Sequence, residues 1–396
     1  MYAGIAMRDP TGDTPTLLVV SVVGIWPVTS GFQLRAAEVV RRLTSRWDLV
    51  LATPGADQLP DAFAGVRARV PLPVTSPWPH LPANHDPAGL SGPLCELVER
   101  WRPAAVLFLC GSEYLADALP PDVPTVSDHV DCLAIAALES WHDAKGVRAR
   151  ARVLQDAWRM ARFERTLVRR MDRTIVAGER DAKLLRRMGG GAPHMLPNGV
   201  ETSAEVCWDA RTEWPSVSFS GVLDYPPNAD AARFLVREVW PTVRHAHSTA
   251  ELRLIGRRPG HEVRALTREP GVSLHANVPD MAQSLRATWL AVAPMRRGSG
   301  VKNKVLEAWA AGRAVVMTPR AVNGLALPPG HEGLVAEGAT ALADAIVSLL
   351  HAPGRLGTLG ADALAFTRTH YSWSGMADRI HELLLEAVQT KGGGGH

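Results

Sequence analysis

Short apolar stretches alternate with helical patterns along this chain, and that alternation constrains the fold more than any other feature of the sequence. A first series of β-rich stretches lies at 16–23, 48–53, 104–110, 124–130 and 173–178. Helical patterns separate them, such as FQLRAAEVVRRLTSRW at 32–47. Strands that alternate with helices form mostly parallel sheets through right-handed crossovers. The sequence therefore predicts an α/β fold.

The alternation stops at a segment that contains Pro and Trp, about 196–215, and then resumes. The second series of β-rich stretches lies at 216–223, 250–256, 271–278, 289–295 and 313–319. A chain of 396 residues is also longer than one hydrophobic core usually supports. We therefore expect two Rossmann-like, doubly wound domains, at 1–200 and 201–373. In such sheets ligands bind beyond the carboxyl ends of the strands.

Charge and cysteine content exclude several classes of protein. With 43 basic and 40 acidic residues the net charge is only +3, so we expect no nucleic-acid partner, and any anion site must be a local cluster. The four cysteines form no CxxC pair, which argues against a zinc site and favours a reduced, cytoplasmic setting. The apolar run at 17–26 is too short to cross a bilayer and is interpreted as a buried strand.

The stretch PMRRGSGVKNKVLEAWAAGRAVVMTP at 294–319 carries the clearest chemical signal. It predicts a loop after a strand, then a helix at 301–312 that ends at Gly312, then another strand. A helix N-terminus with glycines before it suits phosphate groups. The cluster adds four cations, namely Arg296, Arg297, Lys302 and Lys304. Together these features favour a diphosphate site.

Lys304 and Glu307 lie three residues apart on one face of that predicted helix. A carboxylate one turn below a phosphate site can accept hydrogen bonds from both hydroxyls of a ribose. The alternative is a solvated helix ion pair worth about 0.2–0.5 kcal/mol. The position of the pair, directly after a strand and a glycine-containing turn, favours the nucleotide interpretation.

The stretch resembles the donor-binding signature of retaining glycosyltransferase family 4, within the glycosyl transferases group 1, which has the GT-B fold. The matching residues are Pro294, Arg296, Gly298, Gly300, Lys304, Leu306, Glu307, Ala308, Ala310, Gly312, Val315 and Val316. Further similarity lies in Asn198-Gly199-Val200, in SGVLDYPPNADAARFL at 220–235 and in LRLIGRRPG at 252–260.

The resemblance implies two domains facing each other across a cleft, with the closing helix at 374–391 packing back on the first. It implies transfer of a sugar from a nucleotide diphosphate, with a UDP-sugar favoured, to an acceptor hydroxyl with retention of configuration. No cofactor or metal is expected, and the sequence contains no D-x-D pair. The acceptor is a small molecule or a glycan, in secondary-metabolite (aminoglycoside-type antibiotic) or cell-surface polysaccharide biosynthesis. The expected donor contacts are Glu307, Gly298, Ser299, Gly300, Val301, Lys302, Leu306, Gly31, Gly221 and Arg257, and the expected catalytic residues are Lys304, Arg296, Asp131 and His129.

The sequence departs from the family pattern at two places. Ser299 stands where many members carry a glutamate that contacts the donor sugar. The stretch 222–228 contains neither the arginine nor the lysine that many members carry there. These departures leave the identity of the donor sugar open.

Two stretches of the first domain offer candidates for the acceptor side. In GIWPVTSGFQLR at 24–35, Gly31 and Arg35 follow Ser30 at the start of a helix, and the alternative is a plain turn with a capping serine. In SDHVD at 127–131, a histidine beside carboxylates could orient or deprotonate a hydroxyl. The alternative there is that Asp128, His129 and Asp131 cap the next helix.

The predicted helix at 147–171 is rich in arginine. Its charge is either a solvated face or a weak contact with an anionic lipid surface or an acidic acceptor. The protein is expected to be a monomer or a homodimer. Two other functions stay open, a non-hydrolysing nucleotide-sugar epimerase and a non-catalytic subunit that binds the nucleotide sugar.

Overall fold

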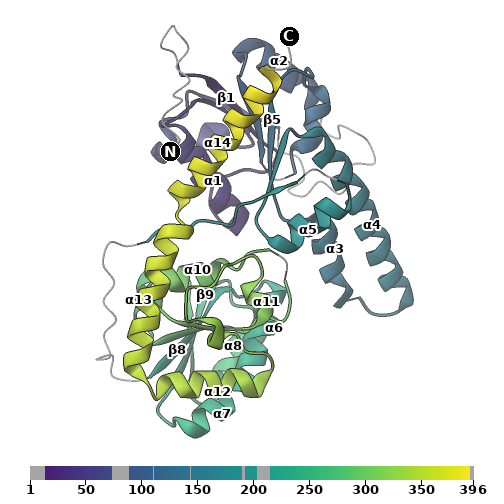
Figure 1. Ribbon diagram of the computed structural model, residues 1–396. Coiled ribbons are helices and arrows are strands. Elements are labelled where there is room, and N and C mark those ends of the chain that lie inside the picture. Colours follow the sequence, from purple (N-terminus) through teal and green to yellow (C-terminus); the bar gives the residue numbers. More distant parts are fainter. Residues whose placement is uncertain are drawn as a thin grey trace. The chain divides into compact units, whose positions relative to one another are not determined.

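The computed structural model describes residues 14–73, 89–109, 111–142, 144–189, 192–202, 215–298 and 300–392 (Figure 1). The chain divides into two compact units. Unit 1 comprises Met1–Pro197 with Trp373–His396, and unit 2 comprises Asn198–Ser372. The sequence placed these boundaries after residues 200 and 373, so each lies within three residues of the division in the structure.

Unit 1 is built on a parallel sheet with the strand order β3-β2-β1-β4-β5-β6-β7. The strands are β1 Thr16–Ser21, β2 Asp48–Thr53, β3 Ala68–Pro71, β4 Ala105–Leu109, β5 Thr125–Val130, β6 Arg173–Val176 and β7 His194–Met195. The helices are α1 Gly31–Leu43, α2 Ser91–Trp101, α3 Leu133–Glu139, α4 Val147–Arg170, α5 Glu179–Arg187 and α14 Trp373–Gly392.

The apolar run in β1 reflects burial on both faces of this sheet. Leu17 and Val19 pack with α1 and α14 on one side, whereas Leu18 and Val20 pack with residues of α2 and α4 on the other. Successive side chains of a strand point to opposite faces, so a central parallel strand needs apolar residues at every position.

Helix α14 follows unit 2 in the chain but belongs to unit 1, as predicted for the closing helix. Figure 1 shows it in yellow, packed beside α1. Its apolar side Trp373, Ile380 and Leu383 joins the core that α1 and the strands form. Trp47 also donates a hydrogen bond from Nε1 to Nδ1 of His381, at 3.0 Å.

Unit 2 has a parallel sheet with the order β10-β9-β8-β11-β12. The strands are β8 Ser216–Val222, β9 Glu251–Arg257, β10 Val272–Ala276, β11 Leu290–Ala293 and β12 Val315–Met317. The helices are α6 Pro226–Phe234, α7 Trp240–Ala246, α8 His261–Ala265, α9 Met281–Arg286, α10 Asn303–Ala310, α11 Pro319–Val322, α12 Ala339–Leu350 and α13 Pro353–His370, with a π-helical segment η5 at Leu235–Val239. The short 3-10 segments of both units are η1 Ala56–Gln58, η2 Asp61–Phe63, η3 Glu113–Ala118, η4 Ser140–His142, η6 Leu266–Arg268 and η7 Glu332–Leu334.

Both sheets have the Rossmann-type strand order, which confirms the predicted α/β fold class. The order reverses between β1 and β4 in unit 1 and between β8 and β11 in unit 2. Helices beside such a switch point leave an opening at the carboxyl ends of the strands, where ligands bind. In unit 2, Gly221 of β8 and the loop that follows β11 lie at these carboxyl ends.

Candidate functional site

The loop after β11 is shaped by two glycines and a lysine. Gly298 and Gly300 have φ angles of 101° and 68°, which residues other than glycine rarely adopt. The buried ammonium of Lys302 donates hydrogen bonds to the carbonyl oxygens of Gly298, at 3.2 Å, and of Gly300, at 2.7 Å. Lys302, predicted as a donor contact, therefore holds the loop in shape through its own side chain. Ser299 lies outside the described residues.

Helix α10 begins at Asn303, two residues later than the sequence suggested. The left-handed backbone at Gly300 and the extended backbone at Lys302 end the loop there. The side chain of Leu306 is only 1% exposed and packs in the core of unit 2, while Val301 packs against that core. Leu306 and Val301 thus orient the helix so that other positions face outward.

Lys304 is half-buried between β8 and α6. Its Nζ donates a 2.8 Å hydrogen bond to Oδ1 of Asn228 and lies 4.1 Å from the ring centroid of Phe219. A Cβ on Gly221 would lie only 3.1 Å from this Nζ, so the glycine leaves room for the ammonium. Burial lowers the pKa of Lys304 to about 7, although Glu307 opposes the shift.

Glu307 is the half-buried carboxylate of the same helix face. Burial raises its pKa, and the positive charges of Lys304 and Arg257 oppose that shift. Arg257 is an exposed side chain at the end of β9. Within the part of the chain that the structure describes, the Glu307 carboxylate takes part in no hydrogen bond or ion pair, and Lys304 bonds Asn228 instead. The helix ion pair considered as the alternative is not formed.

The guanidinium of Arg296 is held by α6 and η5. It donates to both carboxylate oxygens of Asp230, at 2.8 and 3.2 Å, and lies 3.6 Å from Glu238. It also stacks over Phe234, with 4.5 Å from Cζ to the ring centroid. Two carboxylates thus share its charge. Arg297, the next residue, is half-buried.

Asn228 and Asp230 contact two of the predicted site residues but were not themselves among the predicted donor contacts. In the sequence, 220–235 resembles the family pattern and 222–228 lacks arginine and lysine. The structure pairs Asn228 with Lys304 and Asp230 with Arg296. The available signal was the PPNAD sequence at the start of α6, at the carboxyl end of β8.

In unit 1, Gly31 and Arg35 lie on α1 but in different surroundings. Gly31 is exposed at the first position of the helix, and Ser30 Oγ caps it by accepting from the backbone N–H of Gln33 at 3.3 Å. Arg35 is fully buried and donates two 2.8 Å hydrogen bonds to Asp128, plus one of 2.9 Å to the carbonyl of Leu196. The Arg35–Asp128 pair therefore fastens α1 to β5.

His129 is buried between two glutamates. Its Nδ1 lies 3.0 Å from Glu113 and its Nε2 lies 2.9 Å from Glu164, and it is 2% exposed. Burial opposes a charge on the ring, but the hydrogen bonds and charges of the two glutamates outweigh it and raise the pKa of His129 well above its ordinary value. Both ring nitrogens are engaged inside unit 1, which gives His129 a structural role there.

The backbone beside His129 is strained. Val130 has a φ of 62°, and the N–H of Asp131 donates a 2.8 Å hydrogen bond back to the carbonyl of His129. A β-branched residue in this region costs about 1–3 kcal/mol, and such strain concentrates at functional sites. Asp131 is half-buried directly after this turn, at the carboxyl end of β5.

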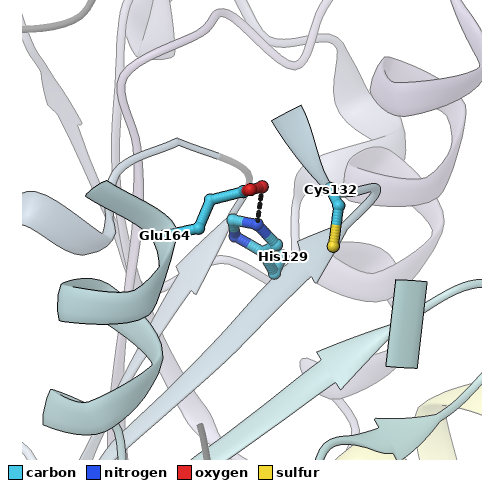
Figure 2. A group of neighbouring side chains, drawn as sticks. All are labelled: His129, Cys132 and Glu164. Carbon is cyan, nitrogen blue, oxygen red and sulfur yellow. Dashed lines mark hydrogen bonds and ion pairs between the residues drawn. The ribbon is translucent and has the colours of Figure 1, made fainter. Parts of the chain in front are cut away.

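One group of potential metal ligands lies together among the described residues: His129, Cys132 and Glu164, with ligand atoms within 4.8 Å of one another (Figure 2). Besides His129, Glu164 accepts hydrogen bonds from the backbone N–H groups of Leu133 and Ala134, at the start of α3. Burial raises the pKa of the Cys132 thiol, which keeps it protonated. These partners make the group a hydrogen-bonded part of the core.

Comparison with known proteins gives a family match for unit 2 and a fold match for the whole chain. Residues 215–352 match the family described as Glycosyl transferases group 1. A search of curated proteins found no match. No helix of the described residues is long and apolar enough to cross a membrane.

Several solved structures share the fold at low sequence identity. Sucrose-phosphate synthase from Thermosynechococcus elongatus is 15% identical with a TM-score of 0.69, covering 94% of this chain and 98% of that one. Anabaena HepE in complex with UDP-glucose is 14% identical with a TM-score of 0.63, covering 94% and 100%. WaaG, a glycosyltransferase involved in lipopolysaccharide biosynthesis, is 14% identical with a TM-score of 0.62, covering 93% and 99%.

Proposed function

We propose that the protein is a retaining glycosyltransferase that moves a sugar from a UDP-sugar to an acceptor hydroxyl, because residues 215–352 match the family described as Glycosyl transferases group 1. The preference for UDP draws on the likeness to HepE, whose structures contain UDP and UDP-glucose. The carboxyl edge of β8, β9 and β11 would bind this donor.

The observation that carries the proposal is the half-buried carboxylate of Glu307 and its raised pKa. This carboxylate takes part in no hydrogen bond or ion pair within the described residues, so its acceptor oxygens are open to a ligand. Arg257 and Lys304 lie near enough to oppose the shift of its pKa. Ribose hydroxyls are donors that match this acceptor, and the diphosphate of the same ligand would reach the cations.

Lys304 would act on the leaving group. Bond cleavage at the anomeric carbon places negative charge on the departing diphosphate, and a nearby ammonium stabilises that charge. Gly298 and Gly300 would let the phosphates approach the loop backbone closely. The mechanism we propose uses no metal, since the lysine takes on the role of neutralising the diphosphate.

The acceptor would bind to unit 1, with Asp131 as the candidate that contacts its hydroxyl. The strained turn before Asp131 supports this role, while the buried surroundings of His129 favour a supporting one. The acceptor would be a small molecule or a glycan of secondary-metabolite or cell-surface biosynthesis.

Calorimetric titration of UDP and 2′-deoxy-UDP into wild type and Glu307→Ala tests the proposal. Each charge-assisted hydrogen bond is worth about 1.5–3 kcal/mol, so the variant should bind UDP at least about tenfold more weakly. Wild type should prefer UDP over the deoxy form, and the variant should bind both almost equally. Glu269→Ala, which removes an exposed glutamate elsewhere in unit 2, is the matched control.

An unaltered ratio between the two nucleotides in Glu307→Ala would refute the ribose role of Glu307. Turnover of a bound UDP-sugar without any acceptor would instead identify an epimerase. Tight binding of UDP-sugars with no transfer to any acceptor tried would favour a non-catalytic subunit.

A further inference from the structure

Helix α4 carries a row of apolar side chains on its solvent-exposed side. Val147, Leu154 and Trp158 are 84%, 52% and 59% exposed, and Ala151 between them is also exposed. Their spacing of four, three and four residues places them on one face of an α-helix. We call these four residues the α4 stripe.

The α4 stripe is not the face that packs into the protein. The buried residues of the helix are Ala157, Glu164, Leu167 and Val168, and α3 packs alongside. Figure 1 shows α3 and α4 projecting together from the sheet of unit 1. Single exposed apolar residues are ordinary, but a continuous row marks a surface that binds something apolar.

Arginines surround the α4 stripe. The exposed ones are Arg148, Arg150, Arg152, Arg159, Arg162, Arg165 and Arg169, together with Arg170, which pairs with Asp117 of η3. The acidic residues of α4 are Asp156 and Glu164, and Glu164 is buried against His129. The guanidinium of Arg162 stacks over Trp158, with 4.9 Å from Cζ to the ring centroid. A positive charge therefore lies directly against an aromatic ring of the α4 stripe.

We propose that the α4 stripe and its arginines dock unit 1 onto the surface of an anionic lipid bilayer. Trp, Leu and Val on one side of a helix with arginines beside them fit the boundary between headgroups and acyl chains. The positive charge fits a negatively charged leaflet. A second copy of the same helix would bring like charges together, which disfavours self-association through this face. This inference does not depend on the donor site.

Vesicle co-sedimentation of the full chain tests the docking. The protein should pellet with vesicles of phosphatidylcholine and phosphatidylglycerol, less with phosphatidylcholine alone, and less again at high salt. Each arginine near such a surface contributes about fivefold in affinity, so Arg162→Gln with Arg165→Gln should lose about 25-fold. Arg237→Gln with Arg355→Gln, which removes two exposed arginines of unit 2, should bind like wild type.

The apolar part is tested with Leu154→Ser and Trp158→Ser. These variants should bind vesicles more weakly than wild type, whereas Met195→Ser, at a 49% exposed position in unit 1, should not. Circular dichroism establishes that each variant is folded. Equal binding of wild type to neutral and anionic vesicles, or no binding at all, would overturn the proposal. So would α4 variants that bind as well as their controls, or a dimer in sedimentation experiments that Leu154→Ser abolishes.

Discussion

Donor binding should weaken as the pH rises above neutrality because of Lys304. Burial lowers the pKa of this lysine to about 7 in the free protein, while Glu307 raises it and Lys302 lowers it further. A bound diphosphate favours the charged ammonium and so raises the pKa in the complex. Below about pH 7 the lysine is already protonated, and binding has its full strength. Above that pH the protein must take up a proton in order to bind.

The size of the effect follows from this proton uptake. Each pH unit above the pKa of the free lysine costs up to about 1.4 kcal/mol, which is about tenfold in dissociation constant. Two units above it, near pH 9, UDP-glucose should bind up to about 100-fold more weakly than at pH 6. UDP-glucose is the suitable probe because its diphosphate stays fully ionised over this range.

The assay is calorimetric titration of UDP-glucose from about pH 6 to about pH 9, with two variants as controls. Lys304→Arg keeps its charge throughout, since the pKa of arginine exceeds about 12, so its affinity should not fall with pH. Lys304→Met should bind weakly at every pH. A flat profile for wild type, or the wild-type slope in Lys304→Met, would refute the assignment of this proton to Lys304.

Three further substitutions test particular contacts. Gly221→Ala should place a Cβ about 3.1 Å from Lys304 Nζ and force an unfavourable φ, so UDP should bind more weakly and stability should fall by about 1–3 kcal/mol, as measured by titration and urea denaturation. Arg35→Met leaves Asp128 buried without its ion pair and should cost about 3–5 kcal/mol in urea denaturation, whereas a change below 1 kcal/mol would contradict the structural role of the pair. His129→Gln should lower the free energy of unfolding most at low pH, because the pKa of His129 is raised in the folded state. The stabilisation from the charged ring is complete below the unfolded pKa of about 6.5 and is lost as the pH rises through the folded pKa. Urea denaturation across pH checks this, and a cost that grows with pH would contradict it.

Most strands could be predicted from the sequence because their signal is local. The runs at 48–53 and 216–223 became β2 and β8 almost unchanged, since apolar residues at successive positions fit a strand that is covered on both faces. β3 and β7 were not predicted. They are the two edge strands of the unit 1 sheet, and both are short. Their residues, ARVP and HM, show little apolar pattern.

The position of the candidate site was also readable from the sequence, but its contacts were not. The glycines and cations at 296–304 lie at the carboxyl end of β11, where the strand order reverses, as the strand-loop-helix pattern predicted. Which cation faces outward was decided by packing. Lys302 turned back onto its own loop, and Arg296 paired with Asp230.

By itself, the sequence determined the two α/β units, the motif at the carboxyl edge and the residue types available there, because strand, helix and turn preferences depend on neighbours within a few positions. Tertiary structure alone decided which side chains meet. Asn228 lies 76 positions from Lys304, and Asp128 lies 93 positions from Arg35. Their contacts arise only when separate elements pack. The lowered pKa of Lys304 and the raised pKa of Glu307 likewise follow from burial that no local pattern encodes.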